Sequence, residues 1–384
     1  MTVAGTVLKP SLSIRQPWLL ALQNLAQDKL RLALSVVGVA LPVMLILFML
    51  GLRAGVFRSA VMYLDNTPGS VAVMPAGVKS TSAGSAQSLP RGTIDAVASA
   101  PGVARVTPVL LMMAIPELHG KKEVIKLVGY DTALGGGPWD LAQGREPAAD
   151  DEVVLDRVLA DRHNFNVGET FYIAGRQLTV VGLSSGASSW TGSYVFARNT
   201  FVESLLLAPG AASFVLVTPT TGTKPADLVG MLQSLPSASV LLKSQVMAND
   251  KQIVADIFDQ VILLMLAAAF IVGALVVGMV IYTATIERRG EYGILKAIGA
   301  RNGMLYRIVV SQAMVAAILG ALLGVGFAFL MGALVMSARP QFLVAIEPSA
   351  IAATLGAGFV MALLGAFVPA RAVAGLAPAE VFRR

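Results

Sequence analysis

The chain has 384 residues, of which 55% are hydrophobic and 14% charged, with a formal net charge of +6 and no cysteine. Soluble domains carry about 25% charged residues, so the composition argues against an ordinary soluble protein, and the lack of cysteine excludes disulfides and Cys-based zinc sites. The charge deficit is concentrated in four stretches without any Asp, Glu, Lys or Arg, namely 32–52, 261–286, 308–338 and 348–370.

Each of these stretches is long enough to cross a membrane. They contain between 21 and 31 residues, and a hydrocarbon core of about 30 Å needs roughly 20 apolar helical residues. The alternative, buried helices of a soluble protein, rarely runs that far without a charge. The sequence therefore predicts four transmembrane helices, with 32–52 serving as a retained signal anchor.

Charge predicts the orientation in the membrane. Segments 1–31, 287–307 and 371–384 together hold 12 basic and 4 acidic residues, whereas 53–260 holds 16 basic and 18 acidic ones. Basic residues concentrate in short cytoplasmic loops. We therefore expect both termini and 287–307 to be cytoplasmic and 53–260 to lie outside, and we read the basic pI as topology, without nucleic-acid binding.

The chain begins with an expected cytoplasmic segment at 1–31. Pro17 can start a helix, and Trp18, Leu22 and Leu25 then recur at helical spacing between polar residues. This pattern is typical of an amphipathic helix on the membrane surface. A frayed cytoplasmic start of the first span explains the pattern equally well.

The outer segment reads as one or two small α+β units. It begins with a helical extension at 53–66 and a Ser/Gly-rich loop at 75–90, and it ends with a helix at 245–260 that continues into the second span. The elements predicted between them are a helix at 93–99, strands at 103–115 and 121–128, a helix at 152–163, a hairpin at 168–182, a strand at 213–218 and a helix at 224–235. The expected fold class is a membrane protein of four transmembrane α-helices with a large α+β extracytoplasmic domain inserted between helices 1 and 2.

Motifs for chemistry on this chain are missing. There is no Gly-Lys-Ser/Thr sequence for a phosphate-binding loop, no His-Glu-x-x-His and no Gly-x-Ser-x-Gly. His119 and His163 are far apart in sequence, and we expect both to be surface residues without a metal. Because no predicted span contains a charged residue, a channel or secondary transporter is disfavoured. We expect no catalytic residues, no metal and no cofactor on this chain.

The segment 287–307 carries the most informative pattern. It is short, highly charged and interrupted by Gly290, Gly293 and Gly299, and a helix placed here would have a charged and an apolar face. A simple solvated connector is the alternative, but a connector does not need four apolar residues between its charges. The residues singled out are Glu287, Arg288, Arg289, Glu291, Tyr292, Ile294, Leu295, Lys296, Ile298 and Arg301.

The third predicted span has a small residue at every fourth position. Residues four apart share one helix face, and small ones let backbones approach closely. Packing within one subunit explains this stripe as well as dimerisation does. Its members are Ala316, Gly320, Gly324, Ala328 and Gly332.

The run 287–300 resembles the signature of FtsX-like ABC transporter permeases, which include MacB-type exporters, LolC/LolE subunits and DevC-like permeases. Pro-Ala-Arg at 369–371 followed by Pro-Ala-Glu at 378–380 is similar to the family's C-terminal ending. In the outer segment, Gly-Arg-Glu-Pro at 144–147 and Glu-Val-Val-Leu at 152–155 resemble the family's periplasmic domain. The resemblance covers most of the chain.

The resemblance implies that 287–301 includes a coupling helix that docks on a separate ABC ATPase, which binds ATP and Mg. It further implies a homodimer of permeases with two ATPase copies in a bacterial inner membrane, assisted by a membrane-fusion adaptor and an outer-membrane channel. Because 31 residues precede the first span, we expect the ATPase to be another polypeptide, as in DevC-like permeases.

Two functions follow from this resemblance. The first is ATP-driven export of a lipid, hydrophobic or peptide substrate through movement of the outer domain. The alternative is an FtsX-like mechanotransmitter that activates an extracytoplasmic cell-wall hydrolase. The length of segment 53–260 favours export.

Overall fold

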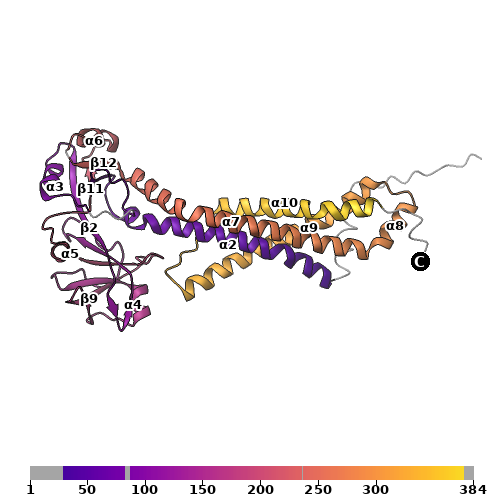
Figure 1. Ribbon diagram of the computed structural model, residues 1–384, viewed down its shortest axis with the longest axis horizontal. Coiled ribbons are helices and arrows are strands. Elements are labelled where there is room, and N and C mark those ends of the chain that lie inside the picture. The colour runs from indigo at the N-terminus through magenta and orange to yellow at the C-terminus, as the bar shows by residue number, and fades with distance from the viewer. Residues whose placement is uncertain (1–28, 83–86, 236, 376–384) are drawn as a thin grey trace, which may run out of the picture. The chain divides into compact units, whose positions relative to one another are not determined.

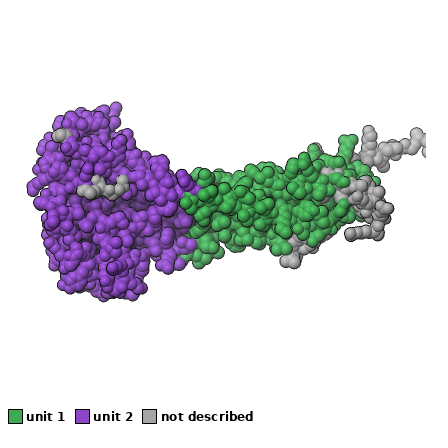
Figure 2. Space-filling model, in the orientation of Figure 1, with its two compact units in different colours: residues 1–51, 261–334, 346–384 green, residues 52–260, 335–345 purple. Residues whose placement is uncertain are grey.

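The computed structural model describes residues 29–82, 87–235 and 237–375 (Figure 1). Residues 1–28 of the predicted amphipathic segment and Pro-Ala-Glu at 378–380 therefore lie outside the described residues. The chain divides into two compact units (Figure 2). The first comprises residues 1–51, 261–334 and 346–384, and the second comprises residues 52–260 and 335–345.

The first unit is helical. Among the described residues, four helices are long and apolar enough to span a membrane. Together with one short helix, they are α2 (Lys29–Asn66), α7 (Lys243–Glu287), α8 (Arg289–Ala297), α9 (Asn302–Ala338) and α10 (Pro348–Ala374). Their outer surfaces are apolar, since Leu264 is 71% exposed and Leu322 64% exposed. Such exposure is unfavourable in water and suits contact with lipid.

Small residues set the distances between the helices. A Cβ atom added at Gly320 would lie 2.7 Å from the carbonyl oxygen of Val36, and one at Gly324 would lie 2.6 Å from the carbonyl oxygen of Ala40. All five members of the small-residue stripe are buried in the chain. In this structure Gly320 and Gly324 of the stripe therefore allow the close approach of α9 to α2 within one subunit.

The second unit contains the remainder of α2 and α7 and an α+β domain. Among the described residues its strands form one sheet of twelve, in the order β12-β1-β11-β2-β5-β10-β7-β9-β8-β3-β4, with β6 paired to β9. The strands are β1 (Val71–Pro75), β2 (Val103–Ala114), β3 (Glu117–Leu118), β4 (Lys121–Lys122), β5 (Ile125–Tyr130), β6 (Leu141–Gly144), β7 (Glu152–Asp156), β8 (Thr170–Ile173), β9 (Arg176–Ser184), β10 (Ser193–Arg198), β11 (Phe214–Pro219) and β12 (Ala238–Leu242). Fold class is thus confirmed as four apolar helices with an α+β domain inserted between the first two.

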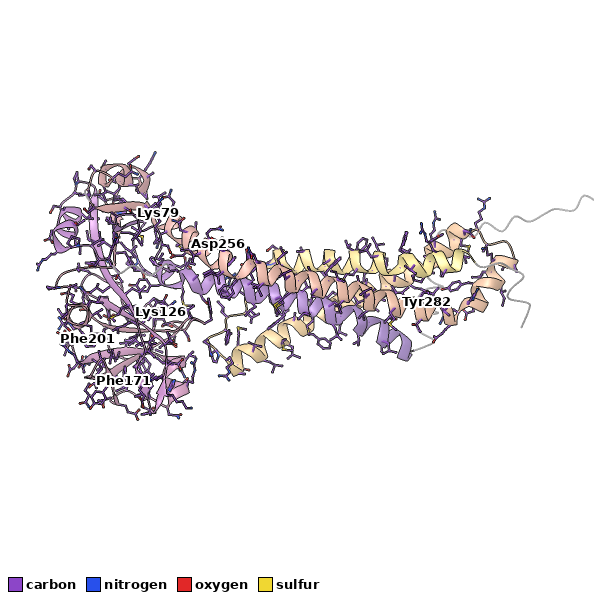
Figure 3. The ribbon with its side chains drawn as sticks, viewed as in Figure 1. Lys79, Lys126, Phe171, Phe201, Asp256 and Tyr282 are labelled. Carbon is purple, nitrogen blue, oxygen red and sulfur yellow. The ribbon has the colours of Figure 1, made fainter. Side chains whose placement is uncertain are left out.

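The long strand β2 joins two halves of the sheet. Its first part pairs with β11, while its last five residues pair with β5. Helices α3 (Arg91–Ala98) and α6 (Pro225–Leu232) pack on the first half, and α4 (Arg157–His163) and α5 (Asn199–Leu206) pack on the second. Each half has its own apolar core, and Phe171 and Phe201 belong to that of the second half (Figure 3).

A third core receives the ends of both long helices. Tyr63 and Leu64 of α2 and Val246 of α7 are buried together with side chains of β2, β5, β10 and β11. The Tyr63 ring contacts those of Trp139, Tyr194 and Phe214 at centroid distances of 6.3, 5.7 and 6.1 Å. Its hydroxyl donates to the carbonyl oxygen of Gly136 at 2.6 Å. The C-terminal end of α2 and the N-terminal end of α7 are therefore both buried in this core.

Asp250 of α7 holds the loop that follows β1. Its carboxylate is fully buried and accepts hydrogen bonds from the Thr81 amide at 2.8 Å, from the Thr81 hydroxyl at 2.6 Å and from the Ser80 hydroxyl. A buried carboxylate is tolerated when hydrogen bonds replace its hydration. Residues 80–82 of the predicted 75–90 loop are thus held against α7.

An ion pair joins α2 and α7 where both leave the first unit. Arg53 donates from Nε and Nη2 to the two carboxylate oxygens of Asp259, both at 2.7 Å. These hydrogen bonds lower the pKa of Asp259 and raise that of Arg53. Two parallel bonds fix the relative register of the two helices at this level.

Reversing one charge of this pair is expected to destabilise the junction. The Arg53→Asp variant places two carboxylates together, and adding Asp259→Arg should restore the pair. The loss is expected to be about 1 kcal/mol, because both groups are partly exposed. Thermal unfolding in detergent measures it.

The pair stabilises the fold above the ordinary carboxyl pKa, and this stabilisation is lost as pH falls through the lowered pKa of Asp259. A double variant no more stable than Arg53→Asp would contradict the pairing.

Two predicted elements are wrong in part. The segment 152–163 is a strand, β7, followed by the short helix α4, because Val153, Val154 and Leu155 are fully buried between β10 and β9. Asp156 ends the strand and caps α4 by accepting from the Leu159 amide at 3.2 Å. The predicted strand 121–128 is two strands, β4 and β5, which are separated by Glu123 and Val124.

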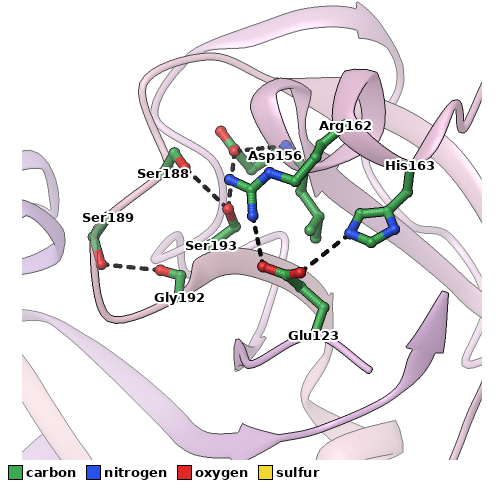
Figure 4. A network of polar contacts seen from close by, with 9 residues as sticks. Glu123, Asp156, Arg162, His163, Ser188, Ser189, Gly192 and Ser193 are labelled. Atoms are coloured by element: carbon green, nitrogen blue, oxygen red, sulfur yellow. Dashed lines mark hydrogen bonds and ion pairs between the residues drawn. The ribbon is translucent and has the colours of Figure 1, made fainter. Parts of the chain in front are cut away.

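The prediction that both histidines lie at the surface is wrong for His163 and correct for His119. His163 is only 4% exposed, and its Nε2 lies 3.2 Å from Glu123, which also accepts from Arg162 at 2.6 Å (Figure 4). His119 is at the surface, but its Nδ1 lies 2.7 Å from the carbonyl oxygen of His163. The two residues are therefore neighbours, because the β2–β5 connection brings His119 to the end of α4.

Candidate functional site: the short helix α8

Helix α8 follows α7 after one residue and ends at Ala297. The Gly299 amide donates to the Lys296 carbonyl oxygen at 3.1 Å, and the Ala300 amide donates to that of Leu295 at 2.9 Å. Gly299 has a φ of +98°, which glycine adopts without steric cost. These two bonds form a Schellman motif and turn the chain sharply into α9.

The charges of α8 suit a helix. Glu291 lies in the first turn and Lys296 in the last, where each complements the helix dipole. Arg288, which precedes the helix, lies 3.7 Å from Glu291. The remaining charged residues of the predicted site, Glu287, Arg289 and Arg301, are exposed.

Tyr292 attaches α8 to α9. Its side chain is only 3% exposed, and its hydroxyl donates to the side-chain oxygen of Gln312 at 3.2 Å. Burial raises the pKa of Tyr292, so the hydroxyl stays protonated and able to donate at neutral pH. The sequence analysis did not single out Gln312, although a polar amide within a charge-free run was a usable signal.

The opposite side of α8 exposes two isoleucines. Ile294 is 55% exposed and Ile298 is 76% exposed, and because they are four residues apart they lie on one face. Leu295 is half-buried. The predicted apolar set is therefore divided, with Tyr292 facing the helical unit and the two isoleucines facing outward among charged residues.

Among the described residues, no group of three or more His, Asp or Glu side chains is placed to hold a metal ion. The arrangement at α8 offers instead a rigid apolar pair surrounded by charges. This combination is typical of a protein-docking surface, where an apolar centre with a polar rim provides affinity and specificity.

Four membrane-spanning helices, an α+β domain inserted after the first and a short amphipathic helix after the second define a multi-pass membrane protein of the permease class. Residues 32–235 match the MacB-like periplasmic core domain, and residues 261–378 match the FtsX-like permease C-terminal domain. The chain belongs to this FtsX/MacB-type family of ABC transporter permeases.

Curated relatives agree with this assignment. The chain is 24% identical over 362 residues to an uncharacterised ABC transporter permease of Mycobacterium tuberculosis, a match that covers 94% of this chain and 98% of that protein. It is also 25% identical over 267 residues to the macrolide export ATP-binding/permease protein MacB of Rhodopseudomonas palustris, covering 66% of this chain and 41% of that protein.

A solved structure that resembles this chain is the periplasmic region of MacB from Actinobacillus actinomycetemcomitans. The match has a TM-score of 0.39 and 16% sequence identity, and it covers 48% of this chain and 94% of that one.

Proposed function

We propose that α8 docks on a separate ABC ATPase subunit and that ATP-driven movement of α8 is passed to the outer domain. Membership of the ABC permease family implies an ATPase partner. The observation that carries the proposal is the exposed pair Ile294 and Ile298 on a helix that Tyr292 holds rigidly. The ATPase binds ATP and Mg, and this chain contributes no catalytic residue.

Three features support transmission through the chain. Tyr292 attaches α8 to α9, and the Gly320–Gly324 face of α9 lies against the backbone of α2. Helices α2 and α7 are each continuous into the second unit. Their ends are buried in the aromatic core around Tyr63. A displacement of α8 can be passed along rigid helices that pack on one another in series, and no path for substrate through these helices is needed.

The work performed by this movement is proposed to be export of a lipid, hydrophobic or peptide substrate from the outer leaflet or periplasm. The assembly would contain two copies of this chain and two ATPases in a bacterial inner membrane, with both termini cytoplasmic, and would act with a membrane-fusion adaptor and an outer-membrane channel. An FtsX-like activation of a cell-wall hydrolase uses the same linkage. Purification of the intact assembly distinguishes them, because an adaptor favours export whereas a bound hydrolase favours activation.

Substitution of the apolar pair tests the docking surface. Ile298→Asp places a charge at the centre of the expected interface, where loss of an anchor residue costs about 2 kcal/mol or more, roughly thirtyfold in Kd. We expect the ATPase to be lost when the variant is purified in mild detergent, while the thermal unfolding of the variant itself is unchanged.

Met231→Asp is the matched control, because Met231 is 53% exposed in the second unit. This variant should retain the ATPase. Normal ATPase recovery and normal ATP-driven activity with Ile298→Asp would refute the proposed docking surface.

A further inference from the structure

Three exposed apolar side chains gather where β2 turns back toward β5. Met113 and Ile115 are each 65% exposed, and Val124 is 36% exposed. Ala114 pairs with Ile125, so Ile115 and Val124 lie directly beyond this last pair of β2 and β5 and near each other. Single exposed apolar residues are common, but a group of them marks an interaction surface.

The loop 185–192 reaches the same place. A Cβ atom added at Gly192 would lie 2.8 Å from the carbonyl oxygen of Val124. Hydrogen bonds fix this loop, since Ser189 donates to the Gly192 carbonyl oxygen at 2.9 Å and Ser193 donates to buried Asp156 at 3.2 Å (Figure 4). The loop therefore presents Trp190 in a defined position.

A further contact comes from β5. The ammonium group of Lys126 donates to Ser189 at 3.4 Å and lies 5.0 Å from the centroid of the Tyr194 ring. Lys126 therefore links the loop 185–192 to strand β5. The base of the loop is thus attached to β5 and to Asp156 at the start of α4.

Trp190 connects this surface to α7 close to the start of its apolar segment. Its ring meets that of Phe258 on α7 edge-on at 4.9 Å. Phe258 precedes Val261, the first residue of the charge-free run of α7, by three residues, which is about 4.5 Å along a helix. Ile257 and Val261 are 60% and 55% exposed. Tryptophan is enriched at this depth, where its ring meets lipid headgroups.

We propose that Met113, Ile115, Val124 and Trp190 form a membrane-contact patch that rests on the lipid surface beside α7. Lipid is the favoured occupant because the patch is continuous, through Phe258, with a helix that enters the bilayer within one turn.

The absence of cysteine from the chain allows a direct test. Single variants Met113→Cys and Ile115→Cys of the full chain carry an environment-sensitive fluorophore in vesicles of phosphatidylcholine and phosphatidylglycerol. Met231→Cys, on α6 and 53% exposed, is the control. Brominated lipid is expected to quench the labels at 113 and 115 at least about twofold more than the control, because only interfacial groups reach the bromines.

A second variant separates lipid contact from folding. Trp190→Ala should reduce lipid quenching at position 115 without changing the circular dichroism spectrum. Equal quenching by brominated lipid at 115 and 231 would overturn the proposal. So would shielding at 115 that disappears when the protein is diluted in excess lipid, because such shielding would come from a second copy of the chain.

Discussion

Leucine in place of Gly324 is expected to force α9 away from α2 and to prevent the helical unit from packing. A Cβ at this position would meet the Ala40 carbonyl oxygen at 2.6 Å and a methyl group of Val43 at 2.8 Å. The first of these is backbone and cannot rotate away. Overpacking a core with a few extra methylenes costs about 1–3 kcal/mol, occasionally more, and four additional carbons against backbone place this variant at the upper end.

A neighbouring glycine supplies the control for this variant. Gly326 lies on the same helix, is exposed, and has no atom within 4 Å of an added Cβ. Gly326→Leu should therefore fold normally, because leucine suits a lipid-facing position. Yield of monodisperse protein and thermal unfolding in nanodiscs compare the two. Equal stability of both leucine variants would show that the α2–α9 approach is not as close as described.

Alanine in place of Tyr63 is expected to destabilise the second unit strongly. The ring is 4% exposed among three other aromatic rings, and removing a large buried aromatic side chain costs about 3–5 kcal/mol. The Gly136 carbonyl oxygen also loses its donor. Thermal unfolding should shift downward by about 10 °C or more.

Two further variants separate the terms at Tyr63. Tyr63→Phe keeps the ring and loses only the hydrogen bond, so its cost should be about 1–2 kcal/mol. Tyr172→Ala removes the same atoms from a side chain that is 58% exposed on β8, and it should stay within about 0.5 kcal/mol of the parent. If Tyr63→Ala unfolds like Tyr172→Ala, the aromatic core does not hold the end of α2.

Burial also affects titratable groups of the second unit. Burial lowers the pKa of Lys126 to about 8, with Asp250 opposing the shift, and it raises the pKa of the Asp156 carboxyl. Both residues hold loops that contact α7 or the patch beside it.

Several elements could be predicted from local signals. In the hairpin 170–184, Ala174 and Gly175 have φ values of +50° and +79°. Two residues with positive φ form the tight turn expected between two strands whose apolar residues alternate. The end of α8 follows from Gly299 in the same way. In contrast, β1, β10 and β12 were not predicted, because short runs such as Val-Ala-Val-Met become strands only when neighbours pair with them.

The candidate site shows the same division. A charged, glycine-interrupted helix between two spans is visible in the residues 287–301. The orientation of this helix cannot be read from the sequence, because Tyr292 and Ile294 both carry apolar side-chain surface and either could face the helical unit. The partner Gln312, twenty residues away, decides that Tyr292 turns inward and leaves Ile294 and Ile298 exposed.

The sequence alone determined the four spans, because a bilayer requires about twenty consecutive apolar residues and that requirement is readable along the chain. It also determined the family through the motif at 287–300. Only the tertiary structure decided that Val153–Leu155 form a strand, that His163 is buried beside Glu123, and that the small face of α9 meets α2. These outcomes depend on contacts between residues distant in sequence, whose energies exceed local propensity.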